Sequence, residues 1–526
     1  MRFTCNSFAV ALLLAAALHA DDRRCATCHP KEVAGYAKSA MAASLSVAAN
    51  QPAGAFDHAL SSTKFTIRAT PEGQIQSYQR GSESSEHRVA YVIGSGAHAF
   101  GYLVQIGDHL FQSPLSYYSS LRTWDVAPGY EESKQPDFSR PVTPECLLCH
   151  AEQPRPIPDT VNRYETPPVV GASISCERCH GTVEAHEKNP VPGSIVNPAK
   201  LQAAARDSVC EQCHLSGEVR IPNPGKSIAD FQPGQRLEDS YSVYVAAHPP
   251  GTTVKVISHV EQLALSLCSR SSGGKLWCGT CHDPHDKPIQ PAAYFRDRCL
   301  TCHAATLEKS HAAPGRDCVS CHMPRLDARD GGHTAFTDHR IARNPKAPTP
   351  ESKQDGLKAW REPDSRFRDR NLAIALVTVG LQDASSDEVI RGYRMLNQVE
   401  KVFPDDPAAL TSLGTVLLRA KQPAEALRRF EKVVTLKPDY SPYRVNAALA
   451  LIALGRKAEA EQQLNHALGL DPLLETAVQV LSAMYRGQGD ADKAADLRSR
   501  YKIEMGITTT SPRLLDRGVT VDQNRR

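Results

Sequence analysis

The chain has 526 residues, enough for about two to four domains, and its 61 basic residues nearly balance 58 acidic ones. A net charge of +3 argues against a nucleic-acid-binding protein, and 41% hydrophobic residues argue against a chain that is disordered throughout. The 16 cysteines and 20 histidines are therefore the feature that a function must explain.

Residues 1–20 have the layout of a secretory signal peptide. Arg2 provides the positive region, Phe8 to Leu18 the apolar core, and Ala20 the small residue before the expected cut. An uncleaved anchor helix is the alternative, although this core is shorter than the roughly 20 residues that a membrane span needs. The sequence therefore predicts an exported protein, periplasmic or extracellular, with no transmembrane segment after cleavage.

Seven Cys-x-x-Cys-His motifs lie between residues 21 and 345. Cysteines three apart share one side of a helical turn, so both sulfurs can bind one porphyrin while the next histidine reaches its iron. Zinc sites would not require a histidine after every pair, and disulfides would not explain the histidines. We expect seven covalently bound c-type haems, attached at Cys25, Cys28, Cys146, Cys149, Cys176, Cys179, Cys210, Cys213, Cys278, Cys281, Cys299, Cys302, Cys318 and Cys321. Cys268 is left over and is expected to be a buried free thiol.

The proximal iron ligands follow directly from the motifs: His29, His150, His180, His214, His282, His303 and His322. Eleven other histidines between residues 21 and 345 could supply the opposite axial positions, so every iron could be bis-histidine. His186 and His285 follow their own motifs too closely to reach the far side of the same haem, and His311 lies just before the last motif. We expect these three to bind neighbouring haems. If one iron lacks a second histidine, we expect it to be the iron of the first motif, because this motif lies at the start of the chain.

The fold class expected for residues 21–345 is mainly α, with short helices and loops around the haems. Within it, alternating apolar residues at about 63–125 predict a small antiparallel β insertion. Residues 215–277 read as Pro/Gly-rich loops, with an amphipathic helix at about 257–268. A polar linker is expected at 346–369.

Beyond the linker, Pro404, Pro438 and Pro472 stand 34 residues apart, the period of a tetratricopeptide (TPR) repeat. We expect a TPR α-solenoid over 370–506 and a mobile tail at 507–526. The groove of such a solenoid usually docks a protein, here a redox partner. The sequence leaves the oligomeric state open.

The haem-bearing part resembles the superfamily of nitrifier tetrahaem cytochromes, pentahaem nitrite reductase and hydroxylamine oxidoreductase. The similar segments are FDH at 56–58, YVIGSGAH at 91–98, SIVNPAKL at 194–201, SHVEQLALSLC at 258–268 and FTDHRI at 336–341. The resemblance implies stacked haems with distal histidines donated across the chain. The distal set that it favours is His58, His98, His186, His259, His285, His311 and His339, with His333 as the alternate to His339. All seven motifs end in His, whereas the nitrite reductases carry a lysine-ligated catalytic haem.

Two functions remain in competition. The favoured one is an exported cytochrome that relays electrons between periplasmic or surface redox proteins. The reason is that the chain has enough histidines to give every haem iron two axial ligands. The alternative is a reductase or oxidase of a small nitrogen or sulfur species at one five-coordinate haem, for which ancestry is the only support. No catalytic residue can be assigned from the sequence.

Overall fold

The computed structural model describes residues 24–47, 49–247, 254–310, 317–343 and 356–509. The expected signal peptide, His311, residues 346–355 of the expected linker and residues 510–526 of the expected tail lie outside the described residues.

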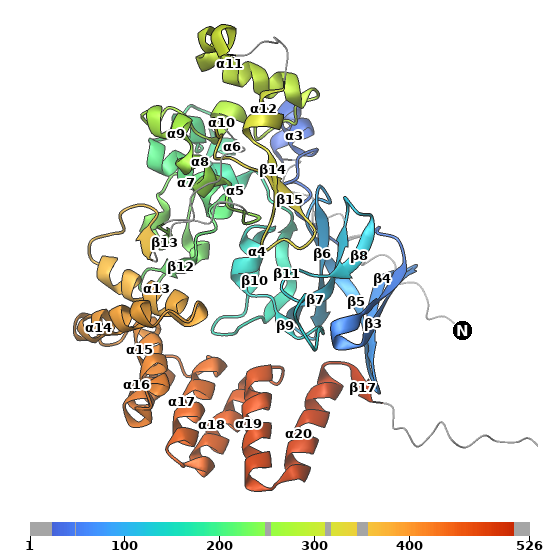
Figure 1. Cartoon of the computed structure of the whole chain (residues 1–526), viewed down its shortest axis with the longest axis vertical. Coiled ribbons are helices and arrows are strands. Elements are labelled where there is room, and N and C mark those ends of the chain that lie inside the picture. Colours follow the sequence, from blue (N-terminus) through green and yellow to red (C-terminus); the bar gives the residue numbers. More distant parts are fainter. Residues whose placement is uncertain (1–23, 48, 248–253, 311–316, 344–355, 510–526) are drawn as a thin grey trace, which may run out of the picture.

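A large antiparallel sheet forms the side of the haem-bearing part that faces away from the motifs (Figure 1). Its strands follow one another in chain order from β2 to β8, with β1 paired to β5 and β9 to β7. The two ends of the row approach each other, because Trp124 Nε1 in β8 donates to the Pro52 carbonyl just before β2 at 2.9 Å. The sheet is therefore nearly a barrel, packed around Phe65, Tyr102 and Phe111. The strands are β1 (Leu45–Ser46), β2 (Gly54–His58), β3 (Thr63–Thr70), β4 (Gly73–Arg80), β5 (Glu83–Ile93), β6 (Ala99–Ile106), β7 (His109–Tyr118), β8 (Thr123–Val126) and β9 (Arg140–Pro141).

The prediction that the haem-bearing part is mainly α is wrong. The structure is 43% helix and 22% strand, and most of the helix belongs to the C-terminal repeats. The structure contains three further sheets, and their strands are short or contain prolines, which obscures the alternation by which a strand is recognised in a sequence. They are β10 (Ala151–Pro156) with β11 (Tyr164–Ala172), β12 (Val219–Pro222) with β13 (Tyr241–Ala246) and β16 (Leu357–Ala359), and β14 (Arg325–Asp327) with β15 (Ala335–Thr337).

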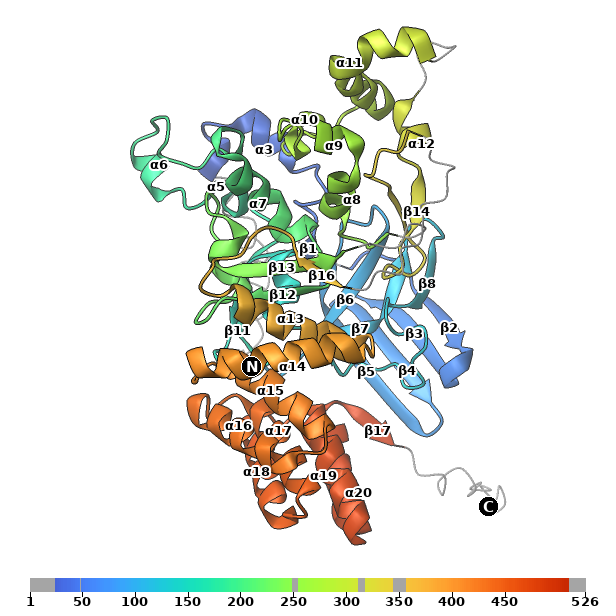
Figure 2. The same cartoon turned by 60° about the vertical axis from the view of Figure 1, so that its left-hand side comes forward.

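Short helices carry the motifs and gather beyond the sheet, at the end of the molecule opposite the repeats (Figures 1 and 2). The expected helix at 257–268 is divided in two at Ser266, whose extended backbone and side chain cap the second half. The helices are α3 (Pro30–Tyr36), α4 (Pro144–Leu148), α5 (Glu177–His180), α6 (Glu184–Lys188), α7 (Ala203–His214), α8 (His259–Leu265), α9 (Leu267–Ser271), α10 (Cys278–Cys281), α11 (Pro291–Ser310) and α12 (Cys318–His322). Four 3-10 turns lie in the connections between elements: η1 (Ala59–Ser61), η2 (Pro198–Lys200), η3 (Ile228–Asp230) and η4 (Leu237–Asp239).

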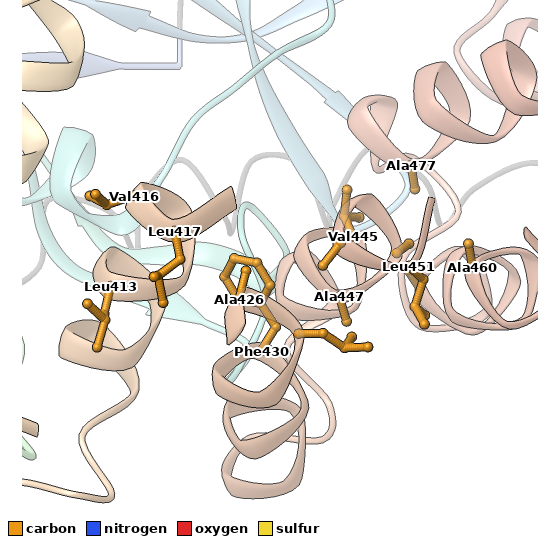
Figure 3. Packing of buried hydrophobic residues seen from close by; sticks show 14 of the residues in the cluster. Leu413, Val416, Leu417, Ala426, Phe430, Val445, Ala447, Leu451, Ala460 and Ala477 are labelled. Carbon is orange, nitrogen blue, oxygen red and sulfur yellow. The ribbon is translucent and has the colours of Figure 1, made fainter. Parts of the chain in front are cut away.

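Eight helices form the C-terminal repeats, stacked as antiparallel pairs. Small and large residues alternate at their contacts: Leu413, Leu417 and Phe430 surround Ala426 (Figure 3). Gly414 has no room for a side chain, since a Cβ there would lie 2.5 Å from the Phe430 ring. The helices are α13 (Arg368–Gln382), α14 (Ser386–Val402), α15 (Pro407–Arg419), α16 (Pro423–Leu436), α17 (Ser441–Ala453), α18 (Lys457–Leu470), α19 (Glu475–Gln488) and α20 (Ala491–Glu504).

The repeats pack directly on the haem-bearing part. After α20, β17 (Ile507–Thr509) pairs with β5, with Ile507 opposite Ser85. At the other end of the repeats, the Asn371 amide in α13 donates to Asn223 and Ser242, which belong to the β12–β13 region. The two parts of the chain therefore share polar contacts at both ends of the solenoid.

Candidate haem-binding sites

The seven motifs lie next to one another although they are dispersed in the sequence. Thiols from different motifs are in contact: Cys149 with Cys213, and Cys210 with Cys278. Motif two therefore adjoins motif four, and motif four adjoins motif five. Cys299 and Cys318 make the same kind of contact between motifs six and seven.

Three motif histidines face a histidine from elsewhere in the chain. The ring centroids are 6.4 Å apart for His29 and His186, 5.8 Å for His180 and His285, and 6.3 Å for His282 and His339, and each pair is within 27° of parallel. Two imidazoles that bind one iron from opposite sides, each at about 2.0 Å, would place their centroids about 6 Å apart. The spacing of all three pairs therefore fits a haem iron between them.

A fourth motif histidine lies in a buried cluster. The centroid of the His214 ring is 5.6 Å from that of His259, whose ring is also 4.9 Å from that of His339. Burial, followed by the nearby His339 and His214, lowers the pKa of His259 to about 3. Its imidazole is therefore neutral at pH 7, which is the form that binds a metal.

Among the residues that the structure describes, Nδ1 of His259 is a buried imidazole nitrogen without a hydrogen-bond partner. A buried polar atom left unpaired costs about 1–3 kcal/mol, so such atoms in a folded protein usually have a bound group to meet. The buried imidazoles are thus suited to bind the haem that the cysteines predict.

Hydrogen bonds to Nδ1 orient four of these rings. His180 donates to the Val196 carbonyl at 2.8 Å, His339 to the Thr337 carbonyl at 2.9 Å and His322 to the Ala342 carbonyl at 2.9 Å. His186 Nδ1 lies 2.8 Å from the Ser194 hydroxyl. A proton held on Nδ1 leaves the lone pair of Nε2 for a metal.

These orienting residues were not singled out as site residues in the sequence. Ser194 and Val196 belong to SIVNPAKL, and Thr337 belongs to FTDHRI. In the sequence, only the resemblance to the multihaem superfamily singles out these two segments. A carbonyl or hydroxyl becomes a partner of an imidazole through its position in the fold. The residue types in these segments therefore do not identify the partners.

Other candidate distal histidines have different surroundings. His58 bonds to Ser61, His98 packs on Phe336 with a centroid separation of 4.2 Å, and His333 Nε2 lies 2.8 Å from an Asp125 oxygen. In the described part of the chain none of these three stacks on a second imidazole. His303 is exposed on α11, and the expected ligand His311 is outside the described residues.

The zinc alternative requires several ligands from the protein around one ion. Among the residues that the structure describes, no three or more His, Cys, Asp or Glu side chains are grouped to hold a bare metal ion. Three motif histidines instead each face one other histidine, with the cysteine pair of the motif beside them.

Residues 116–181 match the family model described as cytochrome c554 and c-prime. This segment contains motifs two and three, and the match implies covalently bound haem. A tetratricopeptide repeat model matches residues 417–484. The first match points to electron transfer and the second to protein interaction.

The similarity to individual proteins is partial. The chain is 26% identical over 180 residues to the multiheme cytochrome MtrA of Shewanella baltica, which covers 30% of this chain and 52% of MtrA. It is 35% identical over 89 residues to the TPR repeat-containing thioredoxin TTL4 of Arabidopsis thaliana, 17% of this chain and 13% of that protein. The chain thus spans about half of one relative and a small part of the other.

Among solved structures, MamA from Desulfovibrio magneticus RS-1 is similar to 26% of this chain and 77% of its own, at 24% identity and a TM-score of 0.23. Within the described residues, no helix combines the length and apolar character needed to cross a bilayer.

Proposed function

We propose that this chain is an exported heptahaem cytochrome that relays electrons between redox partner proteins. The facing histidine pairs carry the proposal, because iron with two axial histidines has no open position for a substrate and is suited to electron transfer. Bound haem would supply the one-electron iron couple. The chain's contribution is to hold neighbouring haems in contact and to keep water and ligands away from the irons.

The pairs also support an assignment of ligands. His186 would serve the haem of His29, His285 that of His180, His339 that of His282 and His259 that of His214. In this assignment the first motif, which is the candidate for an open iron on its sequence position, would have His186 as its partner. His58, His98 and His311 remain as candidates for the other three haems.

Protein docking is the proposed role of the repeats, as the match to TPR sequences suggests. The similarity to a multihaem cytochrome supports export, and the predicted signal peptide would direct it. The count of seven haems depends on the motifs.

One observation favours the reductase alternative. The ring of His150 in motif two is buried, and in the described part of the chain no second imidazole faces it. A haem attached there could keep an open axial position, and a small nitrogen or sulfur species could bind to it.

Electron paramagnetic resonance of the purified ferric holoprotein tests the choice. We expect seven haems per chain by pyridine haemochrome assay and at most one high-spin iron. His186→Ala should convert one further iron to high spin without loss of covalent haem, while His466→Ala, on the exposed face of α18, should leave the spectrum unchanged. Two or more high-spin irons in the wild type, or turnover of nitrite or hydroxylamine, would favour the enzyme.

A further inference from the structure

The β10–β11 hairpin connects two haem motifs without intervening loops at its base. β10 begins at Ala151, the residue after His150 of motif two. β11 ends at Ala172, four residues before Cys176 of motif three. Any shift of this hairpin therefore moves the backbone of both motifs.

Buried polar contacts fix the base of the hairpin to motif three. Glu152 is buried, and one of its oxygens accepts hydrogen bonds from the Ser175 hydroxyl at 2.9 Å and the Ser175 amide at 3.2 Å. Arg178, inside motif three, lies 3.6 Å from Glu152 and donates to the Ala151 carbonyl at 3.2 Å. These contacts make the base a rigid junction between the two motifs.

The tip of the hairpin is held by the repeats. Arg163 donates to the carbonyl of Leu470, the last residue of α18, at 3.1 Å, and also binds Asp108 at 2.7 Å. Asp159 lies 3.1 Å from Lys437, the residue that follows α16. The tip therefore contacts the turns after two successive repeats, and Figure 1 shows the hairpin between α4 and the repeats.

The two tip contacts differ in strength. Asp159 and Lys437 are 40% and 47% exposed, so water screens their ion pair and makes it weak. Arg163 is less exposed and makes charge-assisted bonds to Asp108 and to the repeat carbonyl at once. Arg163 is thus the main connection between the repeats and the hairpin.

We infer that the repeats position the haems of motifs two and three through this hairpin, with Arg163 as the positioning residue. The inference rests on the proposed function, in which both motifs carry haem. A protein that binds the repeats and shifts these turns would then change the reduction potentials of those two haems more than those of the other five. Docking and electron transfer would be coupled by position rather than by direct contact with a haem.

Arg163→Ala in the full-length holoprotein tests the inference, with Arg155→Ala as the matched control. Arg155 lies on the same hairpin, but its ion pair is with Glu165 of the hairpin itself. By spectroelectrochemical titration and paramagnetic resonance, we expect Arg163→Ala to shift two of the seven haem signals at unchanged haem content. Arg155→Ala should match the wild type. Arg163→Lys should shift the two signals less than Arg163→Ala does.

Lys437→Glu is the second variant, since it opposes Asp159 from the repeat side and changes only exposed groups. It should shift the same two signals by a smaller amount, and it decides the matter if Arg163→Ala does not fold. In a His285→Ala background the haem of motif three is marked by high spin, and the marked signal should be among those that shift. Unchanged signals in both variants, or an equal shift of all seven, would overturn the inference. Fewer than seven haems in the wild type would instead contradict the proposed function.

Discussion

Histidines serve structural purposes in this molecule as well as the proposed coordination. Both ring nitrogens of His109 are engaged, Nδ1 with Asp108 at 2.8 Å and Nε2 with Asp471 at 3.0 Å. Asp471 follows α18, so this histidine joins the sheet to the repeats. A ring with no free nitrogen has no lone pair for a metal, and the sequence alone does not distinguish it from a ligand.

His87 should make the attachment of the C-terminal strand sensitive to acid. Burial is the main cause that lowers its pKa to about 4 from the usual 6.5; a hydrogen bond to the backbone of Met505, shortly before β17, and the nearby Glu86 offset this only in part. The unfolded chain therefore binds more protons between these values, so stability is complete above pH 6.5 and falls as the pH approaches 4. The loss is at most about 3 kcal/mol.

Urea unfolding at pH 7 and pH 5 measures this loss, and hydrogen exchange at residues 507–509 localises it. His87→Gln is the control, since it cannot gain a proton. The pH dependence should be weaker in the variant by the His87 contribution. An identical dependence in both proteins would contradict the prediction.

At the scale of elements, a buried ion pair joins α13 to α15 within the repeats, and its arginine also donates to the Pro222 carbonyl in β12. Arg370 and Asp406 have side chains 4% and 5% exposed, with 2.7 Å between Nε and Oδ2. Asp406 also caps α15 by accepting from Ala408 and Ala409. One carboxylate thus holds the start of one helix and the arginine of another.

Arg370→Ala should destabilise the protein by about 3–5 kcal/mol, because it leaves Asp406 buried without its partner. Arg368→Ala is the control in the same helix, where the ion pairs are exposed and their loss costs less than about 1 kcal/mol. Urea unfolding of the two variants gives both values. Equal effects would show that burial does not decide the strength of this pair.

The elements also show how far the sequence can be interpreted. The 34-residue period predicts a repeat, and the matched segment at 417–484 confirms that the chain contains TPR sequence. Strands β10 and β11 have two prolines each, which obscure the alternation that identifies a strand. Contacts between distant segments bring the rings of His29 and His186 to face each other. The spacing of residues in the sequence could therefore not predict that these two histidines pair.

At the scale of the molecule, the repeats and the helices of motifs six and seven lie at opposite ends of the longest axis (Figures 1 and 2). The contacts of Cys149 with Cys213 and of Cys210 with Cys278 involve the motifs of α4, α7 and α10, which lie between these ends (Figure 1). In the proposed relay, a protein docked on the repeats and one that meets α11 would not compete for the same surface.

Haem loading should also change the charge of the whole molecule. Each haem brings two propionates and a ferric bis-histidine core of about +1, so seven haems add about −7. Removal of the predicted signal peptide would take away Arg2 and change the formal charge of +3 to +2, which would give about −5 for the oxidised holoprotein. Isoelectric focusing should therefore give a value below the sequence pI of 8.1, and a value at or above 8.1 would contradict it.

The pairing of β17 with β5 has a consequence for the order of synthesis. Ser84 and Ser85 near the start of β5 pair with β4 on one edge, but their other edge finds its partners only at Thr508 and Ile507. Until β17 has been made, this part of β5 has an open edge, to which another chain could add. Native pairing of that edge must therefore wait for a strand that lies more than 400 residues later in the sequence.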